Sequence, residues 1–188
     1  MMGIVKPALA AGLILLAACG ASPDLYAVTA PEVSQTQRIA FRSVEVRDVS
    51  LPAYASANEI AVQDETGKLV TDSTVLWADE PARALSLELA RNIAALSGAR
   101  VAPEPWPFEA FPDARLDVRF ETLVANALGQ YRATGQYFVS VSDGRRERSG
   151  VFDLSVPYAV DGGPQAIAAA RGQIIADLSV FIAQNGLR

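Results

Sequence analysis

The sequence predicts an α+β fold: an antiparallel sheet of about five or six strands, with two helices covering one face, in a single domain. Three observations support this prediction. Apolar and polar residues alternate along strand-length segments between Leu116 and Tyr158, as in strands that bury one face. Apolar residues recur at helical spacing between Pro81 and Gly98, and again after Pro164. The chain of 188 residues suits one domain behind a short leader.

The leader is residues 1–18, and it has the pattern of a secretory signal peptide. One positive charge precedes twelve residues of Pro, Ala, Gly, Leu and Ile, a run too short to span a bilayer. It ends in Leu16-Ala17-Ala18-Cys19, which resembles the bacterial lipobox. We therefore expect cleavage between Ala18 and Cys19 and lipidation of Cys19, the only cysteine. The alternative is an ordinary signal peptide followed by an accidental cysteine.

Lipidation at Cys19 would anchor the mature chain to a membrane, because several acyl chains together hold a protein stably. We expect no other apolar stretch to span the membrane. Gly20 follows the cysteine, where an Asp tends to retain lipoproteins in the inner membrane of enteric bacteria. The expected location is therefore the outer membrane, facing the periplasm.

Residues 19–37 are expected to form the lipidated cysteine, a tether and a possible first strand near Leu25 to Thr29. The folded domain is expected over residues 38–188. If Leu25 begins the folded part, the tether is about five residues long. At ~3.3 Å per residue, it would hold the domain against the membrane.

The first half of the domain is expected to contain a strand from Ile39 to Val49, a break, and a hairpin. The hairpin joins Glu59–Gln63 to Lys68–Thr71 through a turn in which Gly67 supplies a positive φ. Asp79 is expected to cap the first helix and Pro81 to lie in its first turn.

The second half is expected to begin with a short strand from Arg100 to Trp106. Three alternating segments then predict an antiparallel meander, with a turn at Asp143-Gly144. Gly162-Gly163-Pro164 is expected to open the last helix and Asn185-Gly186 to end it.

Composition excludes several functions. The chain has 21 acidic residues against 16 basic ones and no basic stripe, so we expect no nucleic-acid partner. It contains no histidine, which excludes Ser-His or Cys-His nucleophile systems and histidine-based metal sites. It has no Walker A or GxGxxG sequence. We expect no cofactor, no metal, no catalytic residue and no enzymatic activity.

The remaining polar clusters have both structural and chemical interpretations. Asp117 and Glu121 alternate with Arg119, which favours a solvated or salt-bridged strand face over an acid–base pair. The basic cluster Arg145-Arg146-Glu147-Arg148 is interrupted by an acidic residue, which favours a solvated turn over a contact with phospholipid headgroups. Gly162-Gly163 favours an ordinary helix start over an anion site.

Several short motifs, taken in order, resemble a known family. They are Leu25-Tyr26-Ala27-Val28, Leu51-Pro52-Ala53-Tyr54, Ile60-Ala61-Val62-Gln63 and Trp77-Ala78-Asp79-Glu80-Pro81. This order behind a lipobox resembles the ABC-transport auxiliary lipoproteins, the PqiC/YmbA family. One departure is Leu76, where family members often carry Arg.

The resemblance implies a role in phospholipid trafficking between inner and outer membranes, and so in membrane integrity. The implied partners are an MCE-domain protein and its ABC permease and ATPase, and a homo-oligomer is also expected. Leu51, Pro52, Tyr54 and Trp77 are candidates for a partner-docking surface, because aromatic residues are enriched at contact sites. Their alternative role is structural: Trp77 as a core anchor and Pro52 as a strand stop. The alternative function is a structural or assembly-factor envelope lipoprotein.

Overall fold

The computed structural model describes residues 22–29, 31 and 35–188. The strands and helices along the described chain are β1 (Asp24–Tyr26), β2 (Ser43–Val46), α1 (Ala53–Ser56), β3 (Val62–Gln63), β4 (Leu69–Val70), β5 (Val75–Trp77), α2 (Pro81–Ser97), β6 (Arg100–Pro103), β7 (Ala114–Asn126), β8 (Gln130–Val141), β9 (Arg148–Pro157), the 3-10 turn η1 (Val160–Gly162) and α3 (Gly163–Asn185). Ala18 and Cys19 lie outside the described residues, so the predicted cleavage and lipidation sites stay predictions.

The predicted meander is confirmed and forms the long central part of the main sheet. β7, β8 and β9 pair in antiparallel order, with Leu116 opposite Val139 and Tyr131 opposite Val156. Burial alternates along all three strands, so one face is covered and the other is solvated. This alternation is the pattern from which the meander was predicted.

The prediction of an antiparallel sheet is only partly correct, because the sheet is mixed. β2 runs parallel to both β6 and β7, β3 runs parallel to β7, and β4 pairs antiparallel with β3. The connection from β2 to β6 contains α2, and a crossover of this kind allows two strands to lie parallel. The alternation of buried and exposed residues along one strand carries no information about the direction of the neighbouring strand. The sequence pattern therefore could not reveal the parallel pairs.

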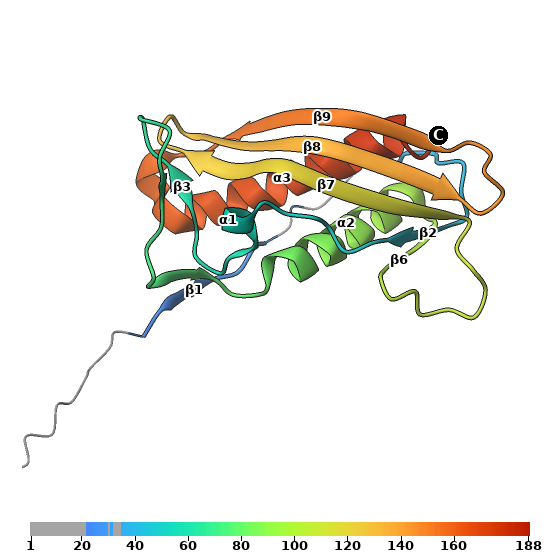
Figure 1. Cartoon of the computed structure of the whole chain (residues 1–188), viewed down its shortest axis with the longest axis horizontal. Helices are drawn as coiled ribbons and strands as arrows, with labels where there is room; N and C mark the ends of the chain where they lie inside the picture. The colour runs from blue at the N-terminus through green and yellow to red at the C-terminus, as the bar shows by residue number, and fades with distance from the viewer. Residues whose placement is uncertain (1–21, 30, 32–34) are drawn as a thin grey trace, which may run out of the picture.

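Two long helices, α2 and α3, lie together on one face of the main sheet (Figure 1), as predicted. Their buried sides include Leu89, Ile93, Ile174 and Leu178, each fully inaccessible to solvent. The short α1 is a third helix that the sequence did not predict. It forms one turn after Pro52, whose carbonyl accepts hydrogen bonds from the amides of the last two helix residues.

The start of α2 differs from the prediction in one detail. Glu80, rather than Asp79, is the N-cap, and its carboxylate accepts hydrogen bonds from the amides of Ala82 and Arg83. Asp79 instead pairs with the Arg83 side chain. Pro81 lies in the first turn and Gly98 ends the helix with φ +68°, both as predicted.

Among the described residues, one helix, Val160–Asn185, is long and apolar enough to cross a membrane by length and composition. This corrects the expectation that no later stretch would reach that length. However, 67% of its most apolar window is buried inside the domain. Its apolar residues therefore belong to the core, where they contact α2, β8 and β9.

A second, two-stranded sheet lies apart from the main one. β1 and β5 pair parallel, with Tyr26 opposite Trp77. Trp77 ends β5 and is followed by a bend that leads into α2, so it lies before the helix, in the entry segment that the sequence indicated. This pairing brings the first described strand of the chain beside the start of α2.

Candidate functional site

The four candidate docking residues lie along the segment that leads from β2 to α2. Leu51 and Tyr54 are half-buried, and Leu51 packs against the core. The Leu123 amide donates a hydrogen bond to the Tyr54 hydroxyl at 3.2 Å, which ties α1 to β7. Trp77 is also half-buried and packs against the core. Each of these side chains therefore has a structural contact as well as an exposed part.

The structure brings Tyr54 and Trp77 together. Both line one narrow hollow of about 10 Å³, together with Pro81, Tyr131 and Arg171. Leu51 and Pro52 are not part of its lining. The hollow is no larger than a single water molecule, so Tyr54 and Trp77 do not line a ligand groove there.

The most unusual residue of the domain is Arg171, in the middle of α3. Only 2% of its surface is exposed, although arginine is almost never fully buried unless it is paired. Its guanidinium carbon lies 4.4 Å from the centre of the Trp77 ring, in a cation–π contact. None of the ion pairs within the described part of the chain uses Arg171.

Two nitrogens of this guanidinium have no hydrogen-bond partner. Nε and Nη2 of Arg171 are buried and unpaired within residues 22–29, 31 and 35–188, as are Oε2 of Glu88 and Nδ2 of Asn92. A buried polar group without a partner costs ~1–3 kcal/mol, and more if it is charged. Such a concentration of unsatisfied groups between two helices is unusual in a core that is otherwise apolar.

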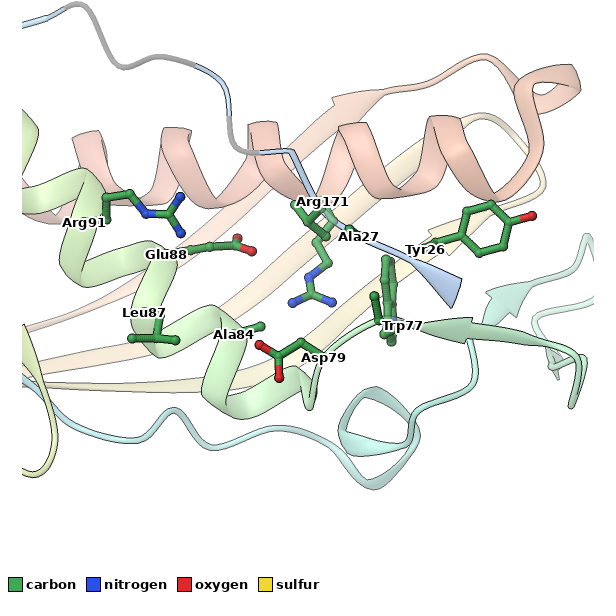
Figure 2. Close-up of a pocket in the computed structure, with 11 residues that line it drawn as sticks. Tyr26, Ala27, Trp77, Asp79, Ala84, Leu87, Glu88, Arg91 and Arg171 are labelled. Carbon is green, nitrogen blue, oxygen red and sulfur yellow. The ribbon is translucent and has the colours of Figure 1, made fainter. Parts of the chain in front are cut away.

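Arg171 and Glu88, but not Asn92, line a pocket of about 210 Å³ that we call the Trp77–Arg171 pocket. Its lining is Tyr26, Ala27, Val28, Trp77, Ala78, Asp79, Ala84, Leu87, Glu88, Arg91 and Arg171. Figure 2 shows Arg171 extending from α3 toward α2 beside the Trp77 ring, with Glu88 pointing from α2 into the same space. Ala27, Ala78 and Arg91 are exposed, so the pocket opens to solvent.

The charges around the pocket do not balance within it. Asp79 is already paired with Arg83, outside the pocket. Burial raises the pKa of Glu88 above its ordinary value, and nearby Arg171 and Arg91 only partly oppose that effect. A raised pKa favours the neutral acid, so the guanidinium of Arg171 is incompletely compensated.

Sequence reasoning missed Arg171, Glu88 and Asn92, although a signal was present. Arg171 is four residues after Ile167 and three before Ile174, so it occupies the apolar face of its helix. Glu88 and Asn92 are four residues apart, and Glu88 is three residues after Leu85, on the buried face of α2. A charged residue at a core position of a predicted helix was the available clue.

The carboxylates considered for catalysis lie elsewhere. Asp117 accepts from the Arg119 guanidinium at 2.8 Å, and Glu121 accepts from the Gln136 amide at 2.9 Å. These contacts fit the salt-bridged strand face that the sequence favoured. Within the described ranges, no cluster of three or more acidic or sulfur ligands lies together to hold a metal ion.

A larger apolar groove, of about 690 Å³, runs between the β3–β4 hairpin and the start of α3. Its lining includes Ile60, Val62, Val70, Val160 and Ile167. Val70 and Val160 are about half exposed, at 47% and 55%. Figure 1 places this hairpin at the same end of the domain as β1, the strand nearest to Cys19 in the sequence.

Comparison with solved structures confirms the architecture. The chain is similar to a crystal structure described as an uncharacterized protein, with a TM-score of 0.70 and 19% identity, covering 87% of this chain and 97% of the other. It is also similar to protein XCC0632 of Xanthomonas campestris, of the DUF330 family, with a TM-score of 0.61 and 18% identity, covering 86% and 95%. At these identities the likeness shows the fold alone.

Comparison with curated protein sequences finds no match. The family comparison is informative, because it covers most of the chain and includes most of β1, all of α2 and the meander, and nearly all of α3. The matching family consists of auxiliary transport components, which are not an enzyme class. The model of the ABC-type transport auxiliary lipoprotein component matches residues 25–183, and the chain therefore belongs to this lipoprotein family.

Proposed function

We propose that the chain is the outer-membrane-anchored periplasmic accessory subunit of an MCE/ABC-type system that transports phospholipid between membranes and maintains membrane integrity. The observation that carries this proposal is the family match over residues 25–183. The lipobox at Leu16–Cys19 supports the anchoring part of the proposal. Gly20 after the cysteine supports the outer membrane as the destination.

In this role the subunit acts by binding, and energy for transport comes from the partner ATPase, since the sequence has no Walker A motif. A short tether supports a position close to the membrane. Only four residues separate Cys19 from β1, which begins at Asp24. At ~3.3 Å per residue, β1 then begins within ~17 Å of the lipid anchor.

We propose that the partner-docking surface includes Leu51, Pro52, Tyr54 and Trp77. Two features support it: these residues lie on the connection between β2 and α2, and Tyr54 and Trp77 line the same small hollow there. Tyrosine and tryptophan bring a large contact area at a low cost in conformational entropy. The nearby apolar groove gives a partner a further contact surface.

The test is site-specific photo-crosslinking in intact cell envelopes. A photoreactive phenylalanine analogue replaces Tyr54 in one strain and Val70 of the groove in another, and crosslinked proteins are identified by mass spectrometry. The matched control position is Val151, which is 74% exposed on the solvated face of β9. We expect an MCE-domain protein, and a second copy of this chain, to crosslink from the first two positions and not from Val151.

Two results would count against the proposal. Crosslinks only to envelope assembly factors would favour a structural or assembly role. An MCE protein captured equally from Val151 would show proximity without a defined docking surface. Fractionation of the same envelopes on a density gradient tests the proposed outer-membrane location.

A further inference from the structure

We propose that the Trp77–Arg171 pocket binds a phosphate group, carried by a phospholipid headgroup or by free phosphate. The inference deepens the proposed transport function, since it names the chemical group that the subunit would recognise. It rests on the geometry of Arg171, the size of the pocket, its charge and its place in the chain.

The geometry of the guanidinium favours an oxyanion. The two unpaired nitrogens, Nε and Nη2, form one side edge of the guanidinium, and their hydrogens point in the same direction. This edge matches two oxygens of a phosphate, which can accept both hydrogen bonds at once. The Trp77 ring covers the face of the guanidinium at 4.4 Å, and the edge itself is buried, so a phosphate reaches it only if the surrounding side chains move to admit the ligand. A bound phosphate would therefore satisfy both nitrogens together.

The size of the pocket favours a compact group. Its volume of about 210 Å³ is smaller than the ~300–1,000 Å³ of pockets that enclose drug-sized ligands. An acyl chain therefore does not fit inside it together with a headgroup. A phosphate fits with the remainder of a lipid extending through the solvent-exposed rim at Ala27 and Ala78.

The charge of the pocket is compatible with an anion. Asp79 is paired with Arg83, and burial raises the pKa of Glu88 above its ordinary value, which disfavours its charged form. In its protonated form Glu88 donates a hydrogen bond and so adds to an anion site. Arg91, exposed at the rim, contributes a second positive charge.

The position of the pocket favours a ligand at the membrane surface. Tyr26, Ala27 and Val28 form one wall, and they follow Cys19 by seven to nine residues. A chain of that length reaches at most ~30 Å. If Cys19 is lipidated, the pocket therefore lies within that distance of the headgroups.

The test is isothermal titration calorimetry on the purified lipidated protein in nonionic detergent. One arm uses sodium phosphate, and the other uses dihexanoyl-phosphatidylglycerol below its micelle concentration, with sodium chloride at equal ionic strength as the blank. We expect saturable binding of at least one probe. Tighter binding of the short-chain lipid assigns the site to lipid headgroups, and tighter binding of inorganic phosphate assigns it to free phosphate.

Substitutions locate the binding. Arg171→Met and Arg171→Lys both remove the two-nitrogen edge, and each should weaken binding at least about tenfold, as expected for a lost charged hydrogen-bond pair. The matched control is Arg132→Met, which removes an exposed arginine that bonds Asp153 on the outer sheet face. Glu88→Gln should bind as tightly as the wild type or more tightly, because the Gln side chain cannot ionise and always offers a donor.

A second readout tests folding and location together. In a Trp106→Phe background Trp77 is the sole tryptophan, so its emission should change in step with the calorimetric titration.

Should Arg171→Met not fold, the Lys variant decides the question. Absence of saturable binding of both probes, or wild-type affinity in the Lys variant, would overturn the inference. Phosphate binding without an MCE crosslink would instead overturn the proposed transport function and leave the phosphate site standing.

Discussion

Trp77→Ala is the substitution that best separates a structural role of this residue from a docking role. The structure predicts a large loss of stability, because the indole both packs against the core and covers the buried Arg171 guanidinium. A desolvated cation–π contact contributes ~2 kcal/mol. Removing a fully buried tryptophan costs ~3–5 kcal/mol, and Trp77 is only half-buried, so its packing contributes ~2 kcal/mol.

The expected total is a loss of about 4 kcal/mol, which corresponds to a fall in Tm of about 8–16 °C for a domain of this size. Thermal melts followed by circular dichroism at pH 7 measure it. The matched control is Trp106→Ala, which removes a tryptophan from the loop after β6, where its ring contacts Phe108. We expect that control to lower Tm by less than half as much.

A double-mutant cycle isolates the contact with Arg171. If Trp77 stabilises the buried guanidinium, Trp77→Ala should cost ~1–2 kcal/mol less in an Arg171→Met background than in the wild type. Strict additivity would refute the cation–π argument. A Trp77→Ala protein that melts like the wild type but no longer crosslinks to its partner would refute the structural role and favour docking.

Three further predictions follow from other parts of the chain. Cys19→Ala should abolish incorporation of labelled fatty acid and release the protein from membranes, and equal labelling of both proteins would contradict lipidation. Burial raises the pKa of Glu88, so its contribution to stability is fully present below the ordinary value of 4.5 and is lost as pH rises through the raised value. The Tm of the wild type should therefore fall relative to Glu88→Gln as pH rises above 4.5, and parallel pH profiles would exclude that titration. Gly135→Ala should destabilise the sheet by ~1–3 kcal/mol, because the added Cβ would lie 2.1 Å from the Arg119 carbonyl oxygen. Gly98→Ala, where nothing lies within 4 Å, should cost ~1 kcal/mol in denaturant titrations, and equal costs would refute the steric argument.

Much of the fold was predictable because it depends on local patterns. Leu85, Leu89 and Ile93 predicted α2, and all three are fully buried. The turn at Gly67 and the end of α2 at Gly98 were predictable because a positive φ favours glycine. Family membership was also predictable from the sequence, because the order of the short motifs can be recognised without knowing which residues they contact.

The candidate site was much less predictable. The sequence drew attention to Tyr54 and Trp77 because they are aromatic and lie beside prolines, but it gave no partner for either. Arg171 is 94 residues after Trp77, and no local pattern shows that α3 places its guanidinium against that ring. A charged residue on an apolar helix face is visible in the sequence, but the group that covers it is not.

The sequence by itself determined the lipobox motif, the two long helices, the hairpin and the meander, because each depends on residues that are near neighbours in the chain. Only the tertiary structure decided that β2 and β3 run parallel to β7, that β1 pairs with β5, and that α2 and α3 enclose a pocket around Arg171. The physical reason is that hydrophobic periodicity reports which face of an element is buried. Strand direction and the meeting of distant side chains depend instead on how the buried faces pack against one another.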